Sequence, residues 1–130
     1  MDKKKEAELT YRAALLDKRL KYLRSEFEKV VLLTTEMEKA KSTLKIEKNA
    51  EVLFPIGGGI MAFGTITDDK YIFPIGENYY IKVDRQTAQK RIEEKLEKIR
   101  QYYDMINEDV KKSEKELIEI MKEIRKLNAE

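Results

Sequence analysis

Apolar residues recur in alternating steps of four and three along two long segments of this chain, which is the heptad spacing of a coiled coil. The first seam is Leu9, Ala13, Leu16, Leu20, Leu23, Phe27, Val30, Thr34, Met37, Lys41 and Leu44. The second seam is Ile92, Leu96, Ile99, Tyr103, Ile106, Val110, Ser113, Leu117, Ile120, Ile124 and Leu127. Only Thr34, Lys41 and Ser113 interrupt their apolar character. The sequence therefore predicts two long helices that pack along these seams.

The helices are predicted over residues 8–48 and 85–128. Asn49 follows the last periodic turn of the first segment and tolerates the left-handed conformation that ends a helix. Asp84 precedes the second segment, where its carboxylate is suited to accept hydrogen bonds from the free amides of the first turn.

The two seams are equally long, about 54 Å each at the usual helical rise. Equal lengths joined by a short insert favour an antiparallel pair. In that arrangement Leu44 lies near Ile92, Leu9 lies near Leu127, and the two chain ends meet at the far tip.

The insert between the helices holds all five glycines and both prolines, and it contains a near-repeat. The sequence VLFPIG at 52–57 returns nineteen residues later as YIFPIG at 71–76, and a second apolar run follows each copy. Apolar runs stopped by glycine predict two consecutive β-hairpins over residues 51–83. The expected fold class is α+β, one domain over 1–130 in which two β-hairpins are inserted between the helices of a coiled coil.

The predicted strands carry apolar residues on both faces, as at Val52, Leu53 and Phe54, and not in the alternation of a sheet with one wet face. Four short strands bury little area against themselves, and an open sheet has unpaired edges. We expect other subunits to complete the sheet, while Pro55 and Pro74 lie at edges or irregular points. The candidate assembly residues are Val52, Phe54, Ile56, Ile60, Phe63, Ile72, Phe73, Ile75, Tyr79, Tyr80 and Ile81.

Composition excludes several kinds of site. Charged residues make up 40% of the chain, but the net charge is only +2 and both signs are mixed, so neither nucleic acid nor a membrane surface is an expected partner. The chain has no cysteine and no histidine, and no lysine and hydroxyl residue follow the glycines at 57–59 as in a phosphate loop. We expect no enzymatic activity, metal or cofactor. Neither a signal peptide nor a transmembrane span is predicted, and a cytoplasmic location is expected.

Residues 55–66 (PIGGGIMAFGTI), the turn at 68–70 and residues 76–82 (GENYYIK) resemble the two-hairpin signature of alpha-class prefoldin subunits, particularly archaeal ones. The plan of helix, double hairpin and helix is similar over nearly the whole chain, whereas beta-class subunits have a single hairpin. Two residues depart from the pattern: Phe63 stands where relatives often have proline, and Pro74 where they usually have an acidic or polar residue.

The resemblance implies an ATP-independent chaperone that holds non-native polypeptides and delivers them to a group II chaperonin. It implies a hexamer of two alpha-type and four beta-type subunits, whose hairpins join in an intersubunit β-barrel and whose coiled-coil tips bind clients. Two alternatives remain open. One is a prefoldin-like scaffold or filament without client transfer, and the other, which the mixed charge disfavours, is a nucleic-acid-binding coiled coil.

Apolar residues near the predicted tip are the candidates for client binding. Some lie off the seams and others are terminal seam residues; together they are Leu9, Tyr11, Leu15, Leu16, Tyr22, Ile118, Met121, Ile124 and Leu127. Tyrosine and methionine suit promiscuous contacts. The alternative is that these are ordinary exposed apolar residues, or that they widen the helix seam. A further cluster, Val31 to Leu33 with Tyr102 and Met105 opposite, is interpreted as packing.

Overall fold

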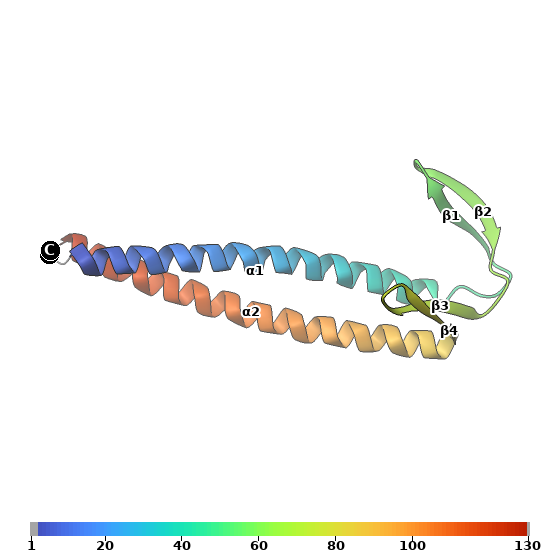
Figure 1. Cartoon of the computed structure of the whole chain (residues 1–130). Coiled ribbons are helices and arrows are strands. Elements are labelled where there is room, and N and C mark those ends of the chain that lie inside the picture. The colour runs from blue at the N-terminus through green and yellow to red at the C-terminus, as the bar shows by residue number, and fades with distance from the viewer. Residues whose placement is uncertain (1–2, 130) are drawn as a thin grey trace. The chain divides into compact units, whose positions relative to one another are not determined.

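The computed structural model describes residues 3–129, and the order of its elements confirms the predicted fold class. Two antiparallel β-hairpins lie between two long helices in the order of the chain (Figure 1). The elements are α1 (Lys3–Thr43), β1 (Glu51–Gly57), β2 (Ile60–Thr65), β3 (Lys70–Gly76), β4 (Tyr79–Asp84) and α2 (Arg85–Ala129).

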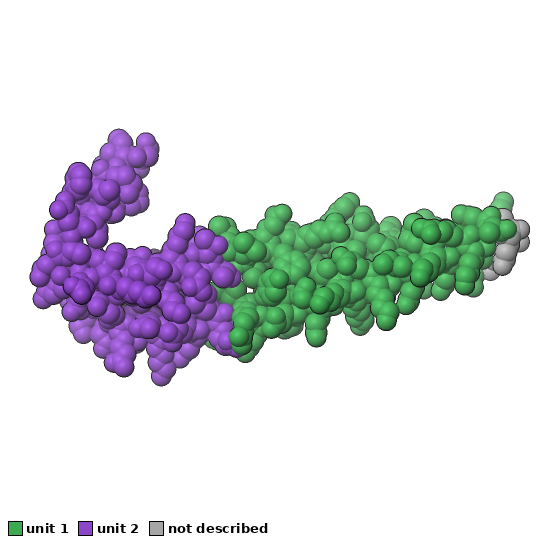
Figure 2. Space-filling view, turned by 180° about the vertical axis from the view of Figure 1, so that it is seen from behind, with its two compact units in different colours: residues 1–33, 98–130 green, residues 34–97 purple. Residues whose placement is uncertain are grey.

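The chain divides into two compact units, which Figure 2 colours separately. The arm unit consists of residues 1–33 and 98–130, and the hairpin unit consists of residues 34–97. The sequence predicts one domain, and its ends at residues 1, 2 and 130 lie outside the described residues. Each unit has its own apolar core and is described by itself.

In the arm unit, α1 and α2 pack along the predicted seams. Leu23, Val30 and Ile106 form the buried core of this unit, with Phe27, Ile99 and Val110 packed against it. The rings of Phe27 and Tyr103 meet edge to face, with their centroids 5.1 Å apart. Ser113 interrupts the second seam, as the sequence shows, yet it is buried and only 3% exposed. Its hydroxyl donates a hydrogen bond to Asp109 one helical turn earlier, which satisfies the buried oxygen.

In the hairpin unit, the core consists of Leu44, Val83, Ala88 and Ile92. The predicted neighbours Leu44 and Ile92 are therefore confirmed. Asp84 is the N-cap of α2, since its carboxylate accepts a 2.7 Å hydrogen bond from the backbone amide of Thr87.

The end of α1 differs from the prediction. The helix runs from Lys3 to Thr43 instead of over residues 8–48. After Thr43 the backbone tightens, because the amides of Lys45 and Ile46 bond to carbonyls only three residues earlier. Asn49 does adopt a positive φ of 72°, but it serves the turn into β1 and not the helix end.

The two hairpins have the same register, offset by nineteen residues. Glu51 pairs with Thr65 in the first hairpin, and Lys70 pairs with Asp84 in the second. The register shifts just after Pro55 and again just after Pro74, so each proline sits at a bulge, the irregular position predicted for it.

Candidate functional site

The arm unit exposes large apolar side chains away from its seam. On α1 the exposed fractions are 66% for Tyr11, 49% for Leu15 and 61% for Tyr22. On α2 they are 55% for Ile118 and 44% for Met121. All five are among the residues predicted to bind clients, and in the single chain their side chains are accessible to a binding partner.

The candidates that belong to the seam are not open in the same way. Leu9 is 4% exposed, and Leu16, Ile124 and Leu127 are partly buried. Both helices continue through these residues, so the helix ends do not open to expose them. Leu9 is therefore inaccessible unless the helices separate, and the open surface consists of the off-seam residues.

The second apolar cluster of the arm unit is exposed, so its interpretation as packing is wrong within this chain. Val31, Leu32 and Leu33 are 59%, 61% and 46% exposed, and Met105 is 67% exposed. These α1 residues lie between the seam positions Val30 and Thr34, so the heptad spacing that predicts the seam is the signal that they face outward.

Two polar bridges join the helices of the arm unit on one side. Arg19 donates two hydrogen bonds to the carboxylate of Asp109, and this pairing lowers the pKa of Asp109. Tyr102 donates a 2.8 Å hydrogen bond to Glu26, which also pairs with Lys29. The hydrogen bond from Tyr102 lowers the pKa of Glu26, and the same bond raises the pKa of Tyr102. These bridges hold α1 against α2, and Glu26 is engaged by both Tyr102 and Lys29.

The β1–β2 hairpin contributes no side chain to the buried core of the hairpin unit. One of its faces carries Leu53, Met61 and Phe63, which are 55%, 48% and 76% exposed. On the other face, the ring of Phe54 lies over Gly64, where an added Cβ would come within 2.8 Å of the ring. The ring remains 45% exposed, so both faces of this hairpin are open.

The β3–β4 hairpin is open on one face only. Tyr71, Phe73, Ile81 and Val83 share the other face, which packs on the core of the hairpin unit. The cations of Arg91 and Lys95 lie 6.0 Å and 5.3 Å from the centre of the Phe73 ring.

The candidate assembly residues therefore fall into two groups. Phe73 and Ile81 are partly buried against the core of the hairpin unit, so they are less open to another subunit, and their role in assembly stays a prediction. The exposed residues of the set are Phe54, Ile56, Ile60, Phe63, Ile72, Ile75, Tyr79 and Tyr80. Val52 is partly buried. Leu53 and Met61 are also exposed but are missing from the predicted set. The apolar character of both strand faces is the signal that could have found them.

Arg85 connects the parts of the hairpin unit. Its guanidinium donates a 2.7 Å hydrogen bond to the carbonyl of Ile46 and lies 3.5 Å from Asp69 in the β2–β3 connection. A hydrogen bond with Tyr71 raises the pKa of Arg85. One side chain thus joins the segment after α1, the β2–β3 connection and the start of α2.

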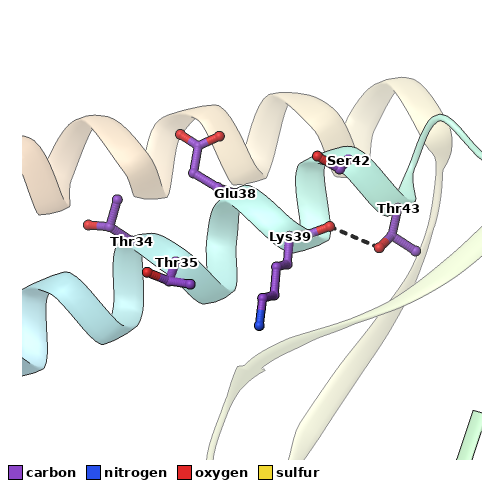
Figure 3. A pocket seen from close by; sticks show the side chains of 6 residues that line it. All are labelled: Thr34, Thr35, Glu38, Lys39, Ser42 and Thr43. Atoms are coloured by element: carbon purple, nitrogen blue, oxygen red, sulfur yellow. Dashed lines mark hydrogen bonds between the residues drawn. The ribbon is translucent and has the colours of Figure 1, made fainter.

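A polar hollow lies on α1 in the hairpin unit and is drawn in Figure 3. Its lining comes from one helix: Thr34, Thr35, Glu38, Lys39, Ser42 and Thr43. The hydroxyl of Thr43 donates a hydrogen bond to the carbonyl of Lys39, one turn earlier (Figure 3). The hollow has the chemistry of a polar helix surface. Within residues 3–129, no group of acidic side chains is placed to hold a metal ion, and neither helix is apolar enough over a sufficient length to cross a membrane.

Known proteins share this arrangement. The family model described as Prefoldin subunit matches residues 16–130. Prefoldin subunit alpha of Picrophilus torridus is 32% identical over 74 residues, which cover 52% of this chain and 53% of that protein. The match thus spans about half the length of that curated relative.

A solved structure is similar over most of the chain. The cryo-EM structure of filamentous PFD from Methanocaldococcus jannaschii superposes with a TM-score of 0.74 and covers 88% of this chain and 98% of its own. Its sequence identity is 17%, so this likeness concerns the fold. The family match covers most of the sequence, the relative is an alpha subunit, and two hairpins stand between the helices. The chain therefore belongs to the prefoldin family and is a subunit of its alpha type.

Proposed function

We propose that this chain is a subunit of an ATP-independent chaperone that holds non-native polypeptides. The exposed apolar residues of the arm, Tyr11, Leu15 and Tyr22 on α1 with Ile118 and Met121 on α2, support the proposal most directly. Several such weak contacts on neighbouring arms bind one client reversibly and gain strength by multivalency. The client is then passed to a group II chaperonin, in a cytoplasmic setting.

Assembly is proposed to use the hairpins. The β1–β2 hairpin exposes both faces and the β3–β4 hairpin exposes one, so these strands gain burial by completing a sheet with other subunits. The proposed partners are beta-type subunits, in a hexamer of two alpha-type and four beta-type chains. Sedimentation of this chain with and without a beta-type partner measures that composition.

The holding activity is tested by aggregation of a denatured model substrate. The assembled subunits are expected to suppress light scattering at near-stoichiometric concentration without ATP. Removal of residues 1–12 and 123–130 is expected to weaken this suppression while sedimentation shows the same assembly. A wild-type assembly without effect on aggregation would overturn the function, and full activity after trimming would overturn client binding at the tips.

A second candidate function is a filament or scaffold without client transfer. It is favoured by the fold similarity to a PFD described as filamentous. Negative-stain images of the protein without partners separate the candidates, because ordered filaments together with no holding activity support the scaffold.

A further inference from the structure

The outer face of α1 carries a second stripe with heptad spacing. Its residues are Tyr11, Leu15, Lys18, Tyr22, Ser25, Lys29 and Leu32, and we call it the outer stripe. Each member follows a seam residue by two positions. Two residues turn an α-helix by about 200°, so the outer stripe points away from the seam. All seven residues are exposed, and the whole stripe lies in the arm unit.

The outer stripe distinguishes α1 from α2. Its apolar members Tyr11, Leu15, Tyr22 and Leu32 are 49% to 66% exposed. The matching positions on α2 in the arm unit are Lys98, Gln101, Met105, Glu108, Lys112, Lys115, Glu119, Lys122, Lys126 and Ala129. Met105 is the only large apolar residue among them. These positions on α2 are nearly all polar, as expected for a helix face that meets only water. The outer stripe of α1 is half apolar, which is unusual for such a face.

The charge of the outer stripe has one sign. Lys18 and Lys29 belong to it, and no acidic residue does. Three acidic residues lie close to it in the sequence, at positions 17, 26 and 28, and of these Glu26 already accepts a hydrogen bond from Tyr102 and pairs with Lys29. Residues 11–32 hold six basic and three acidic side chains in all, a net charge of +3. A partner that buries the apolar side chains therefore meets net positive charge, which favours negative charge beside the partner's own apolar groups.

The length of the outer stripe also limits its partner. From Tyr11 to Leu32 it spans about 32 Å along the helix axis. An extended polypeptide of roughly ten residues covers this distance. The stripe is thus long enough for one continuous segment of a non-native chain.

We propose that the outer stripe of α1 is the client-binding track of this subunit, that it continues along the arm to Leu32, and that it prefers client segments combining apolar and acidic residues. The proposal rests on the proposed chaperone function and deepens it by naming the class of client. It also assigns client binding to Leu32, a member of the exposed cluster at residues 31–33.

The acidic preference is tested with two labelled peptides of about ten residues. Both contain the same leucines and phenylalanines, and one places glutamate between them where the other places lysine. Fluorescence anisotropy with the assembled protein is expected to show three- to tenfold tighter binding of the glutamate peptide at low salt, a difference that shrinks near 1 M salt, where the screening length is about 3 Å. Equal or tighter binding of the lysine peptide would overturn the preference.

The position of the track is tested with matched substitutions on the two helices. Leu32→Ser is expected to weaken binding of the glutamate peptide about three- to tenfold, and Lys18→Gln about twofold. The controls are Met105→Ser and Lys115→Gln, which change an exposed apolar residue and an exposed lysine on the outer face of α2. Both are expected to leave binding unchanged. Equal effects on both helices would overturn the track.

Other partners give different results in the same assays. Displacement of the peptide by single-stranded DNA would overturn the proposal in favour of nucleic acid, and a smaller sedimenting species for Leu32→Ser would overturn it in favour of a contact between copies. If the protein binds the glutamate peptide but does not suppress aggregation, the holding function fails and the track stands. If it suppresses aggregation but Leu32→Ser binds like wild type, the track fails and the function stands.

Discussion

The turn residues of the two hairpins have the same backbone shape but different chemistry. Gly58 and Gly59 have φ values of 57° and 79°, and Glu77 and Asn78 have 48° and 66°. Positive φ at both central positions is typical of a type I′ turn, which matches the twist of the strands. Glycine adopts this conformation without steric cost, whereas glutamate does not.

At Glu77, glycine is therefore expected to stabilise the second hairpin. Glu77→Gly should raise the free energy of unfolding by up to about 1 kcal/mol, a gain reduced by the greater freedom of glycine in the unfolded chain. The reverse change at the equivalent position, Gly58→Glu, should lower it by about 1–2 kcal/mol. Urea unfolding of both variants measures the pair, and a loss of stability in Glu77→Gly would contradict this view of the turn.

Asp109 makes the stability of the arm unit dependent on pH. Its hydrogen bonds from Arg19 hold its pKa below the ordinary value of an aspartate, near 4. The unfolded chain thus binds this proton more readily than the folded one, so the contribution of the pair is complete above that value and is lost as the pH falls through the lowered pKa.

Asp109→Asn is expected to lower Tm by a few degrees at pH 7, and by progressively less as the pH falls from about 4 to 2. Melting curves followed by circular dichroism over this range measure the difference. Asp104→Asn, an exposed carboxylate on the same helix, is the control. A difference from wild type that stays constant with pH would show that the pair does not titrate with folding.

At the level of elements, the start of α2 depends on its cap. Asp84 accepts hydrogen bonds from Thr87 through both the hydroxyl and the amide, and this lowers the pKa of Asp84. Asp84→Ala is expected to lower Tm by roughly 3–5 °C, because an orphan amide of the first turn loses its partner. Asp84→Asn keeps a capping oxygen and should stay within about 1 °C of wild type in the same melt. Equal losses in both variants would point to charge instead of capping.

The two hairpins are expected to differ in local stability. The β3–β4 hairpin packs one face on the core of the hairpin unit, and the β1–β2 hairpin has no such support. In the isolated chain, amide hydrogen exchange should be at least tenfold faster in β1 and β2 than in β3 and β4. Addition of a beta-type partner should slow exchange in β1 and β2. Fast exchange that persists in the assembled protein would exclude this hairpin from the assembly.

The sequence predicts the elements well and their surroundings less well. Heptad spacing and the glycine and proline positions indicated both helices and both hairpins, and Asp84 marked the start of α2 correctly. The end of α1 was misplaced because Leu44 continues the seam after the helix has ended. The sequence could not show that Phe73 and Ile81 face the chain's own helices, since equivalent residues of a near-repeat have the same pattern whether or not a helix covers them.

For the whole molecule, assembly is expected to depend on the open strand faces. Phe63 is 76% exposed on β2, and the nineteen-residue offset places Lys82 at the matching position of β4. Phe63→Lys copies the residue of the second hairpin into the first. It should weaken association with beta-type subunits by about tenfold or more while helical content stays unchanged. Phe63→Tyr should associate like the wild type. Analytical ultracentrifugation measures the association of both variants. Unchanged association of Phe63→Lys would exclude this face from the interface.

The shared register of the hairpins has a consequence for how such chains arise. Because the pairing repeats after nineteen residues and the first hairpin leaves the helix core untouched, removing residues 51–69 would leave Ala50 directly before the second hairpin with that hairpin's ladder intact. A single in-frame deletion of this length would thus give a one-hairpin chain, with loss of the ion pair between Asp69 and Arg85, and a tandem duplication would give the reverse. The number of hairpins is then a property that recombination changes in one step, while the sequences of the two helices stay the same.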